Sequence, residues 1–254
     1  MTKLTRTSLS NLRDLTAARV SLPTTGNSIA TDEVLSFRRD HALARDAVHA
    51  ELYLPLFAQR LIAELPILTD AGIVVIQLRT NAPNRATYLR HPNLGRTLHP
   101  DSVAMLRRSP CDLAITIADG LSALAIERNA VPLLAHLLPQ LLANAWNLAP
   151  IAIVQQGRVA VGDEVGANLG ARCSLILIGE RPGLSSPDSM GAYLTWSPGP
   201  DRTDADRNCL SNIRNGGLSP KVAADRLFRL LQVARLKQRT GTSLKEGAIE
   251  LDAE

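Results

Sequence analysis

The chain contains a series of short, unbroken apolar segments separated by helix-like stretches, and this alternation limits the folds open to it. The apolar segments are GIVVIQL (72–78), LAITIA (113–118), IAIVQ (151–155), CSLILIG (173–179) and AYLTW (192–196). Strands that are apolar at nearly every position are covered on both faces, as in a parallel sheet between two helical layers. The sequence therefore predicts an α/β fold with a mostly parallel, Rossmann-like sheet flanked by helices.

The stretches between these strands have helical patterns. The expected helices cover 101–108, 121–129, 132–146, 162–170 and about 219–240. We expect Pro139 to kink or split the third of these, because proline has no N–H to donate within a helix. Ser219 followed by Pro220 marks the start of the last helix, because serine caps helices and proline is favoured at the first helical position.

The N-terminal part of the chain is more polar and predicts a helical arm. A helix is expected from Thr31, which can cap it, with Asp32 and Glu33 placed favourably in the first turn of the helix dipole. Such an arm is stable only when it packs on something else. We divide the chain into an N-terminal helical arm or subdomain over residues 1–60 and an α/β domain over residues 61–254.

Charge and cysteine content exclude several classes of protein. The net charge is +4, but the basic residues are scattered among acidic ones, as in DRTDADR (201–207), without the basic stripe and interleaved aromatics of a nucleic-acid binder. Cys111, Cys173 and Cys209 are widely separated and odd in number, which argues against disulfides and for a reducing compartment. Neither a signal peptide nor a membrane span of about 20 apolar residues is recognisable. We expect a cytoplasmic protein that binds neither nucleic acid nor membrane.

The familiar catalytic and cofactor motifs are missing from the sequence. No G-x-G-x-x-G follows a strand and no P-loop occurs. The five histidines form no HExxH and no Cys/His ladder, so no metal site is expected, and no G-x-S-x-G elbow marks a nucleophile. We therefore assign no catalytic residue to this chain.

Polar segments near the strand ends are the best candidates for a binding site, because ligands of open α/β sheets lie beyond the carboxyl ends of the strands. GERPGLSSPDSMGAYLTWSP (179–198) and DRTDADRNCLSNIRNGG (201–217) flank one strand, and long loops in compact domains are usually functional. We expect both to form the rim of one site. From spacing alone, simpler explanations are favoured: Glu180 as a charge paired with Arg181 or an exposed arginine, and Cys209 as a small buried thiol.

Five segments together resemble one enzyme family. They are ATYLRHPNLGRTL (86–98), ADGLSALAI (118–126), QGRVAVGDEVGANLGA (156–171), GERPGLSSPDSMGAYLTWSP (179–198) and DRNCLSNIR (206–214). In order and spacing they resemble the small (light) chain of ethanolamine ammonia-lyase, and the resemblance covers the chain from about residue 8. It implies a subunit of an adenosylcobalamin-dependent lyase that converts ethanolamine into acetaldehyde and ammonia by a radical mechanism. It also implies activity only with a large subunit, commonly in a hexamer of heterodimers.

The resemblance also implies a set of cofactor contacts. Val159, Glu180 and Cys209 match the family's cobalamin-contacting positions at the interface with the large subunit. Glu180 and the backbone near Cys209 are expected to hydrogen-bond the peripheral amides of the corrin, and Val159 to offer an apolar or main-chain contact. The substrate-binding and radical-stabilising groups belong to the large chain. No Asp-x-His-x-x-Gly pattern occurs, so we expect base-on binding, in which the cofactor keeps its own benzimidazole on cobalt.

Two other interpretations stay open at this point. One is a stand-alone nucleotide-binding α/β enzyme, and the other is a structural or assembly protein that shares the fold without the cofactor. The location also has two interpretations. Some family members carry a longer N-terminal extension that directs them into a bacterial microcompartment, whereas here the resemblance begins almost at the start, which favours the cytoplasm.

Overall fold

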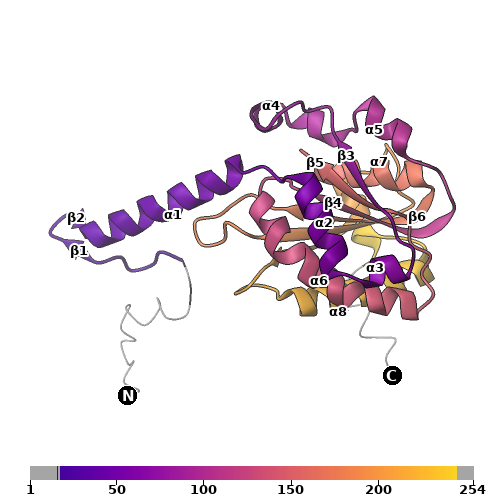
Figure 1. The fold of residues 1–254 in the computed structure, drawn as a ribbon. Helices are drawn as coiled ribbons and strands as arrows, with labels where there is room; N and C mark the ends of the chain where they lie inside the picture. The colour runs from indigo at the N-terminus through magenta and orange to yellow at the C-terminus, as the bar shows by residue number, and fades with distance from the viewer. Residues whose placement is uncertain (1–15, 17, 245–254) are drawn as a thin grey trace, which may run out of the picture.

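The computed structural model describes residues 16 and 18–244 (Figure 1), and the rest of the expected arm lies outside these residues. The predicted fold class is confirmed: the described chain forms a mixed six-stranded sheet in the order β3-β5-β4-β6-β7-β8, flanked by helices. The strands are β3 (Val75–Arg79), β4 (Cys111–Ala118), β5 (Ile151–Gln155), β6 (Ala171–Gly179), β7 (Met190–Trp196) and β8 (Arg207–Ile213). Strands β3, β5, β4 and β6 are parallel, and β7 and β8 continue the sheet antiparallel.

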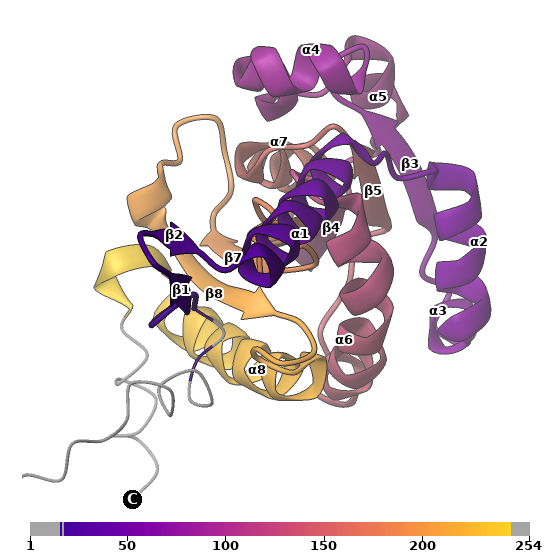
Figure 2. The same ribbon diagram turned by 90° about the vertical axis from the view of Figure 1, so that its left-hand side faces the viewer.

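Helices cover both faces of the sheet, which explains the unbroken apolar strands (Figures 1 and 2). One face carries α2 (Leu54–Glu64), α3 (Ile67–Asp70), α6 (Ala123–Ala143) and α8 (Pro220–Lys237). The other carries α7 (Val159–Leu169), with α4 (Arg85–Arg90), the 3-10 helix η2 (Pro92–Arg96) and α5 (Pro100–Met105) above it. Strand β6 contributes Leu175 and Leu177 to the first apolar cluster and Ile176 and Ile178 to the second.

The structure corrects the expected helix boundaries around the two prolines. The helices expected over 121–129 and 132–146 form the single helix α6, with Pro132 and Pro139 both inside it. Each proline removes one backbone hydrogen bond, but more than half of the helix's residues are buried between the sheet and α8. Tertiary packing of this kind outweighs local propensity, so the prolines do not divide the helix.

The N-terminal helical arm is confirmed for the part that the structure describes. Helix α1 (Thr31–His49) extends away from the sheet, with a small ribbon of β1 (Thr24–Thr25) and β2 (Ser28–Ile29) at its far end (Figure 1). Thr31 is the first helical residue and does not form the expected cap, because Ala30 occupies the capping position. Only Ala44 and Ala47 of α1 are buried. None of the helices in residues 16 and 18–244 is long and apolar enough to cross a bilayer.

The second polar segment, 201–217, was expected to be a loop at the rim of the site, and this is wrong for most of its length. It contains strand β8, in which Cys209 pairs with Tyr193 and Ile213 with Met190 of β7. Strand β7 starts beside Gly179, at the carboxyl end of β6, and ends opposite Cys173. The β7–β8 connection therefore lies at the opposite edge of the sheet, because a hairpin reverses the chain direction. The carboxyl edge holds the β6–β7 connection, residues 180–189, and also the end of β8, where Ile213 pairs with Met190.

Candidate functional site

A pocket of about 320 Å³ lies at the carboxyl edge of the parallel strands. The turns after β4, β5 and β6 meet there, as expected for an open α/β sheet. Its lining includes Val159 and Glu180, together with Tyr88, Gly120, Arg158 and Tyr193 from neighbouring elements. Two of the three residues expected from sequence therefore line one cavity.

Two glycines bring the turns after β4 and β6 into backbone contact. Gly120 has φ +54, in the left-handed region, and a Cβ there would lie 2.2 Å from the Gly179 carbonyl oxygen. A Cβ on Gly179 would lie 2.1 Å from the carbonyl oxygen of Ser122. The Leu121 N–H also donates to the Gly179 carbonyl at 2.9 Å. This part of the pocket is therefore built of main chain, with no room for larger residues.

The carboxylate of Asp119 connects the ends of β4 and β5. It is fully buried, and its Oδ1 accepts from the Gly157 N–H at 3.2 Å. Arg85 lies beside it, with Nη1 3.4 Å from Asp119 Oδ2 and 2.7 Å from the Gly120 carbonyl oxygen. Burial raises the pKa of Asp119 to about 6, while Arg85 and the backbone donors act in the opposite direction. The network fixes the strand ends that frame the pocket.

Tyr88 lines the pocket and lies close to two arginines. Its hydroxyl donates to the Gly157 carbonyl at 2.8 Å, and burial raises its pKa. The guanidinium carbons of Arg85 and Arg158 lie 5.1 and 4.4 Å from its ring centre, within range of cation–π attraction. Among the described residues, Arg85 Nη2 and Arg158 Nε are buried and find no hydrogen-bond partner. Buried donors are normally satisfied, so an unpaired one at a pocket points to an acceptor supplied by a ligand.

Glu180 follows β6 directly, and one of its two carboxylate oxygens accepts hydrogen bonds from the protein. Its Oε2 accepts from the Ser189 hydroxyl at 2.5 Å and from the Asn212 N–H at 3.2 Å. Within the described chain, Oε1 has no hydrogen-bond partner and no ion pair joins Glu180 to Arg181, so that alternative is not formed. The carboxylate is thus fixed in place with one oxygen left to accept a hydrogen bond.

Cys209 does not line the pocket, but it pairs across β7 and β8 with Tyr193, which does. Cys209 is exposed, which overturns the alternative of a buried thiol. Partial desolvation, together with the charge of Glu180, raises the pKa of the thiol. Cys209 is therefore a neutral side chain at neutral pH, beside the pocket rather than in its lining.

Val159 is the first residue of α7, and Arg158 is its N-cap residue. The sequence pointed to Val159 but not to Arg85, Tyr88 and Tyr193. One signal was present: Arg85 and Tyr88 are three residues apart in a helix and so share a face. The pairing of Tyr193 with Cys209 depended on β8, which the sequence did not reveal.

Comparison with known proteins identifies the family. The family model for ethanolamine ammonia-lyase light chain (EutC) matches residues 6–245. The chain belongs to this family. Its relatives include proteins named ethanolamine ammonia-lyase small subunit from Pseudomonas putida, 48% identical over 243 residues, and from Bradyrhizobium diazoefficiens, 49% identical over 240 residues. The matches cover 93% of this chain in both cases, and 87% and 89% of the relatives.

A third relative, from Azotobacter vinelandii, carries the same name and is 49% identical over 247 residues, with 93% of this chain and 87% of the relative covered. The resemblance found in the sequence is thus confirmed at the level of the light-chain family. The matched residues include the whole pocket, from Tyr88 to Tyr193, and strand β8.

Proposed function

We propose that this chain is the small subunit of an adenosylcobalamin-dependent ethanolamine ammonia-lyase and binds one side of the cofactor at the interface with the large subunit. The assembled enzyme would convert ethanolamine into acetaldehyde and ammonia. The observation that supports this best is a pocket at the carboxyl edge, in a light-chain family member, that combines a fixed carboxylate oxygen with an unpaired buried donor.

The residues present fit the periphery of a corrin. Its side-chain amides each offer N–H donors and a carbonyl acceptor, and the free Oε1 of Glu180 and the Nε of Arg158 are complementary to these. Val159 adds an apolar contact at the start of α7, and Cys209 with Tyr193 continues the same side of the sheet. The bound cofactor supplies radical chemistry by homolysis of its cobalt–carbon bond. This chain's residues bind and orient the ring edge, so none of them is assigned a catalytic role.

The size and openness of the pocket support a shared site. A cavity of about 320 Å³ takes only part of a macrocycle, so the remainder of the ring needs a second chain to cover it. We assign that role to the large subunit, in a hexamer of heterodimers, located in the cytoplasm or in a bacterial microcompartment. In the same proposal, residues 1–60 form an N-terminal arm and residues 61–254 form the cobalamin-contacting α/β domain.

We also propose base-on binding. None of the described residues that line the pocket is a histidine, so no imidazole of this chain is placed there to replace the cofactor's benzimidazole on cobalt. A hyperfine coupling to isotope-labelled histidine in the paramagnetic holoenzyme would contradict this part of the proposal.

The test uses the chain co-expressed with its large subunit. We expect the purified complex to form acetaldehyde from ethanolamine only when adenosylcobalamin is added. Glu180→Gln should raise the KM for adenosylcobalamin about tenfold, the loss of one charge-assisted hydrogen bond, with little change in kcat at saturation. Glu127→Gln, an exposed change on α6, is the matched control. A complex that binds no corrinoid, or a Glu180 variant with unchanged KM, would refute the proposal.

A further inference from the structure

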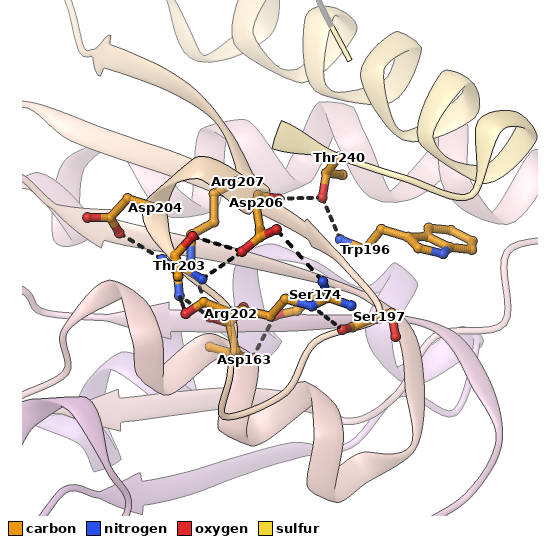
Figure 3. Close-up of polar contacts among 11 residues, drawn as sticks. Asp163, Ser174, Trp196, Ser197, Arg202, Thr203, Asp204, Asp206, Arg207 and Thr240 are labelled. Carbon is orange, nitrogen blue, oxygen red and sulfur yellow. Dashed lines mark hydrogen bonds and ion pairs between the residues drawn. The ribbon is translucent and has the colours of Figure 1, made fainter. Parts of the chain in front are cut away.

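A second polar cluster lies behind the pocket and joins α7 to the edge strand β8 (Figure 3). At its centre are Asp163 of α7 and Arg207 of β8, whose side chains are only 5% and 3% exposed. Arg207 donates through both Nε and Nη2 to one oxygen of Asp163. Its remaining Nη1 donates to Asp204 at 2.7 Å, and Nη2 also contacts the Arg202 carbonyl at 3.3 Å. The guanidinium is therefore held on several sides.

Each member of this pair lies close in sequence to a proposed cofactor contact. Asp163 is four residues after Val159, one turn further along the same face of α7. Arg207 is two residues before Cys209, so both side chains lie on the same face of β8. The ion pair therefore connects the element that carries Val159 directly to the strand that carries Cys209.

Other contacts fix α7 against β6 but not against β8. A Cβ on Gly162 would lie 2.8 Å from Cβ of Ile176, and the Ser174 hydroxyl donates to the Gly162 carbonyl at 2.7 Å. These contacts set how closely the helix approaches β6. Strand β8 lies two strands further out, at the edge of the sheet, and β7 is its partner there. A buried ion pair fixes such a separation more sharply than apolar contacts, because it tolerates little change in geometry.

The hairpin connection behind the pair is itself held in place. Thr203 and Asp206 form a reciprocal cap around a short 3-10 helix, and Arg202 donates to the Ser197 carbonyl at 2.8 Å. Thr240 bonds both the Asp206 carbonyl, at 2.6 Å, and the Trp196 N–H, at 2.8 Å (Figure 3). These contacts hold Arg207 in place on the side away from the pocket. Arg207 in turn fixes the position of Asp163 through their ion pair.

We propose that the Asp163–Arg207 ion pair is a positioning device for the cobalamin site, which sets the separation between Val159 on α7 and Cys209 on β8. This inference rests on the proposed function. Neither residue touches the pocket, so both act through the elements that they join and are positioning residues rather than catalytic ones.

The test changes the length of the pair while keeping its charges. Asp163→Glu adds one methylene and should let the complex with the large subunit assemble, with α7 displaced from β8. We expect a KM for adenosylcobalamin about tenfold higher and a similar rise in the Kd for cyanocobalamin, with kcat at saturation within about twofold. Arg207→Lys should show the same split, because lysine keeps the charge and loses the fork-shaped donor set.

Leu61→Ala is the control for a loss of stability alone. Leu61 is fully buried in α2, at the other edge of the sheet, and its truncation should lower Tm without moving the KM for adenosylcobalamin. If Asp163→Glu and Arg207→Lys lower Tm but keep the Kd for cyanocobalamin within twofold, the pair is merely structural and the inference is overturned. Failure of both variants to assemble would overturn it too, because the pair would then serve folding. An unchanged KM in Glu180→Gln would instead contradict the proposed function itself.

Discussion

At the scale of single residues, Asp119 shows how a buried carboxylate can organise a site at a cost. Its oxygens accept the Gly157 N–H and lie beside Arg85, so the ends of β4 and β5 cannot move apart freely. Burial nevertheless disfavours its charged form, and the pKa rises to about 6. Asp119 therefore holds the strand ends in position, although burial of its charged form does not stabilise the fold.

Replacing Asp119 should therefore change the pH dependence of stability. The folded chain holds the proton of Asp119 more tightly than the unfolded chain does, because its pKa is about 6 when folded and about 3.9 when unfolded. Its contribution to stability is thus fully present below pH 4 and is lost as the pH rises to about 6. Relative to Asp119→Asn, the wild type should lose about 2 kcal/mol in the free energy of unfolding between pH 4 and pH 7. Denaturant unfolding across this range measures it, and a constant difference would contradict it.

Gly120 gives a second prediction at this scale. Gly120→Ala places a methyl group on a residue with φ +54 and 2.2 Å from the Gly179 carbonyl oxygen, so the two turns must separate. We expect a loss of at least about 2 kcal/mol in unfolding free energy. Gly199→Ala is the control, since a methyl group on Gly199 would meet no other atom within 4 Å. Equal melting temperatures for the two variants would show that the turn relaxes freely.

At the scale of elements, the sequence predicts the strands that carry an unbroken apolar run. All five apolar segments contain strands, because strands covered on both faces are apolar at nearly every position. Strand β8 was missed because it buries only Arg207, Leu210 and Ile213 and so carries no apolar run. For the site, Val159 and Glu180 came from family resemblance, whereas Tyr193 and Arg207 depended on strand pairing. Pairing between distant segments is not encoded in any local pattern.

Helix α6 offers a test of the packing argument. Pro139 is exposed, and in its place alanine would supply the N–H that can donate to the carbonyl of Ala135. Pro139→Ala should therefore raise the free energy of unfolding by about 1 to 3 kcal/mol. Thermal unfolding measures the effect. A lower Tm would mean that proline stabilises the folded chain through some contact other than those between the sheet and α8.

At the scale of the whole molecule, the arm and the α/β unit share few contacts. Helix α1 projects from the body (Figure 1), buries only Ala44 and Ala47, and contributes the Val48 carbonyl that accepts from Arg85 at 2.8 Å. The pocket, by contrast, gathers residues from α4, the turn after β4, α7, β6 and β7. The buried apolar clusters and the pocket are therefore concentrated in the α/β unit.

Deleting residues 1–40 should leave the α/β unit folded, because the deletion removes no residue of either apolar cluster. We expect a fall in Tm of less than about 5 °C, as for a change of roughly 1 kcal/mol. The retained Val48 keeps its contact with Arg85. Scanning calorimetry of the full and shortened chains, each with the large subunit, makes the comparison, and a fall of more than about 10 °C would show that the arm belongs to the folding unit.

The order of strands in the sheet has a consequence for synthesis on the ribosome. Strand β3 is the first of the sheet to be made, yet it pairs with β5, whose residues follow more than seventy positions later, while β6, β7 and β8 join through successive hairpins. Local pairings form quickly and distant ones wait for loop closure. Since β8 is the last strand to emerge, the nascent chain cannot complete its sheet until residue 213 has been translated.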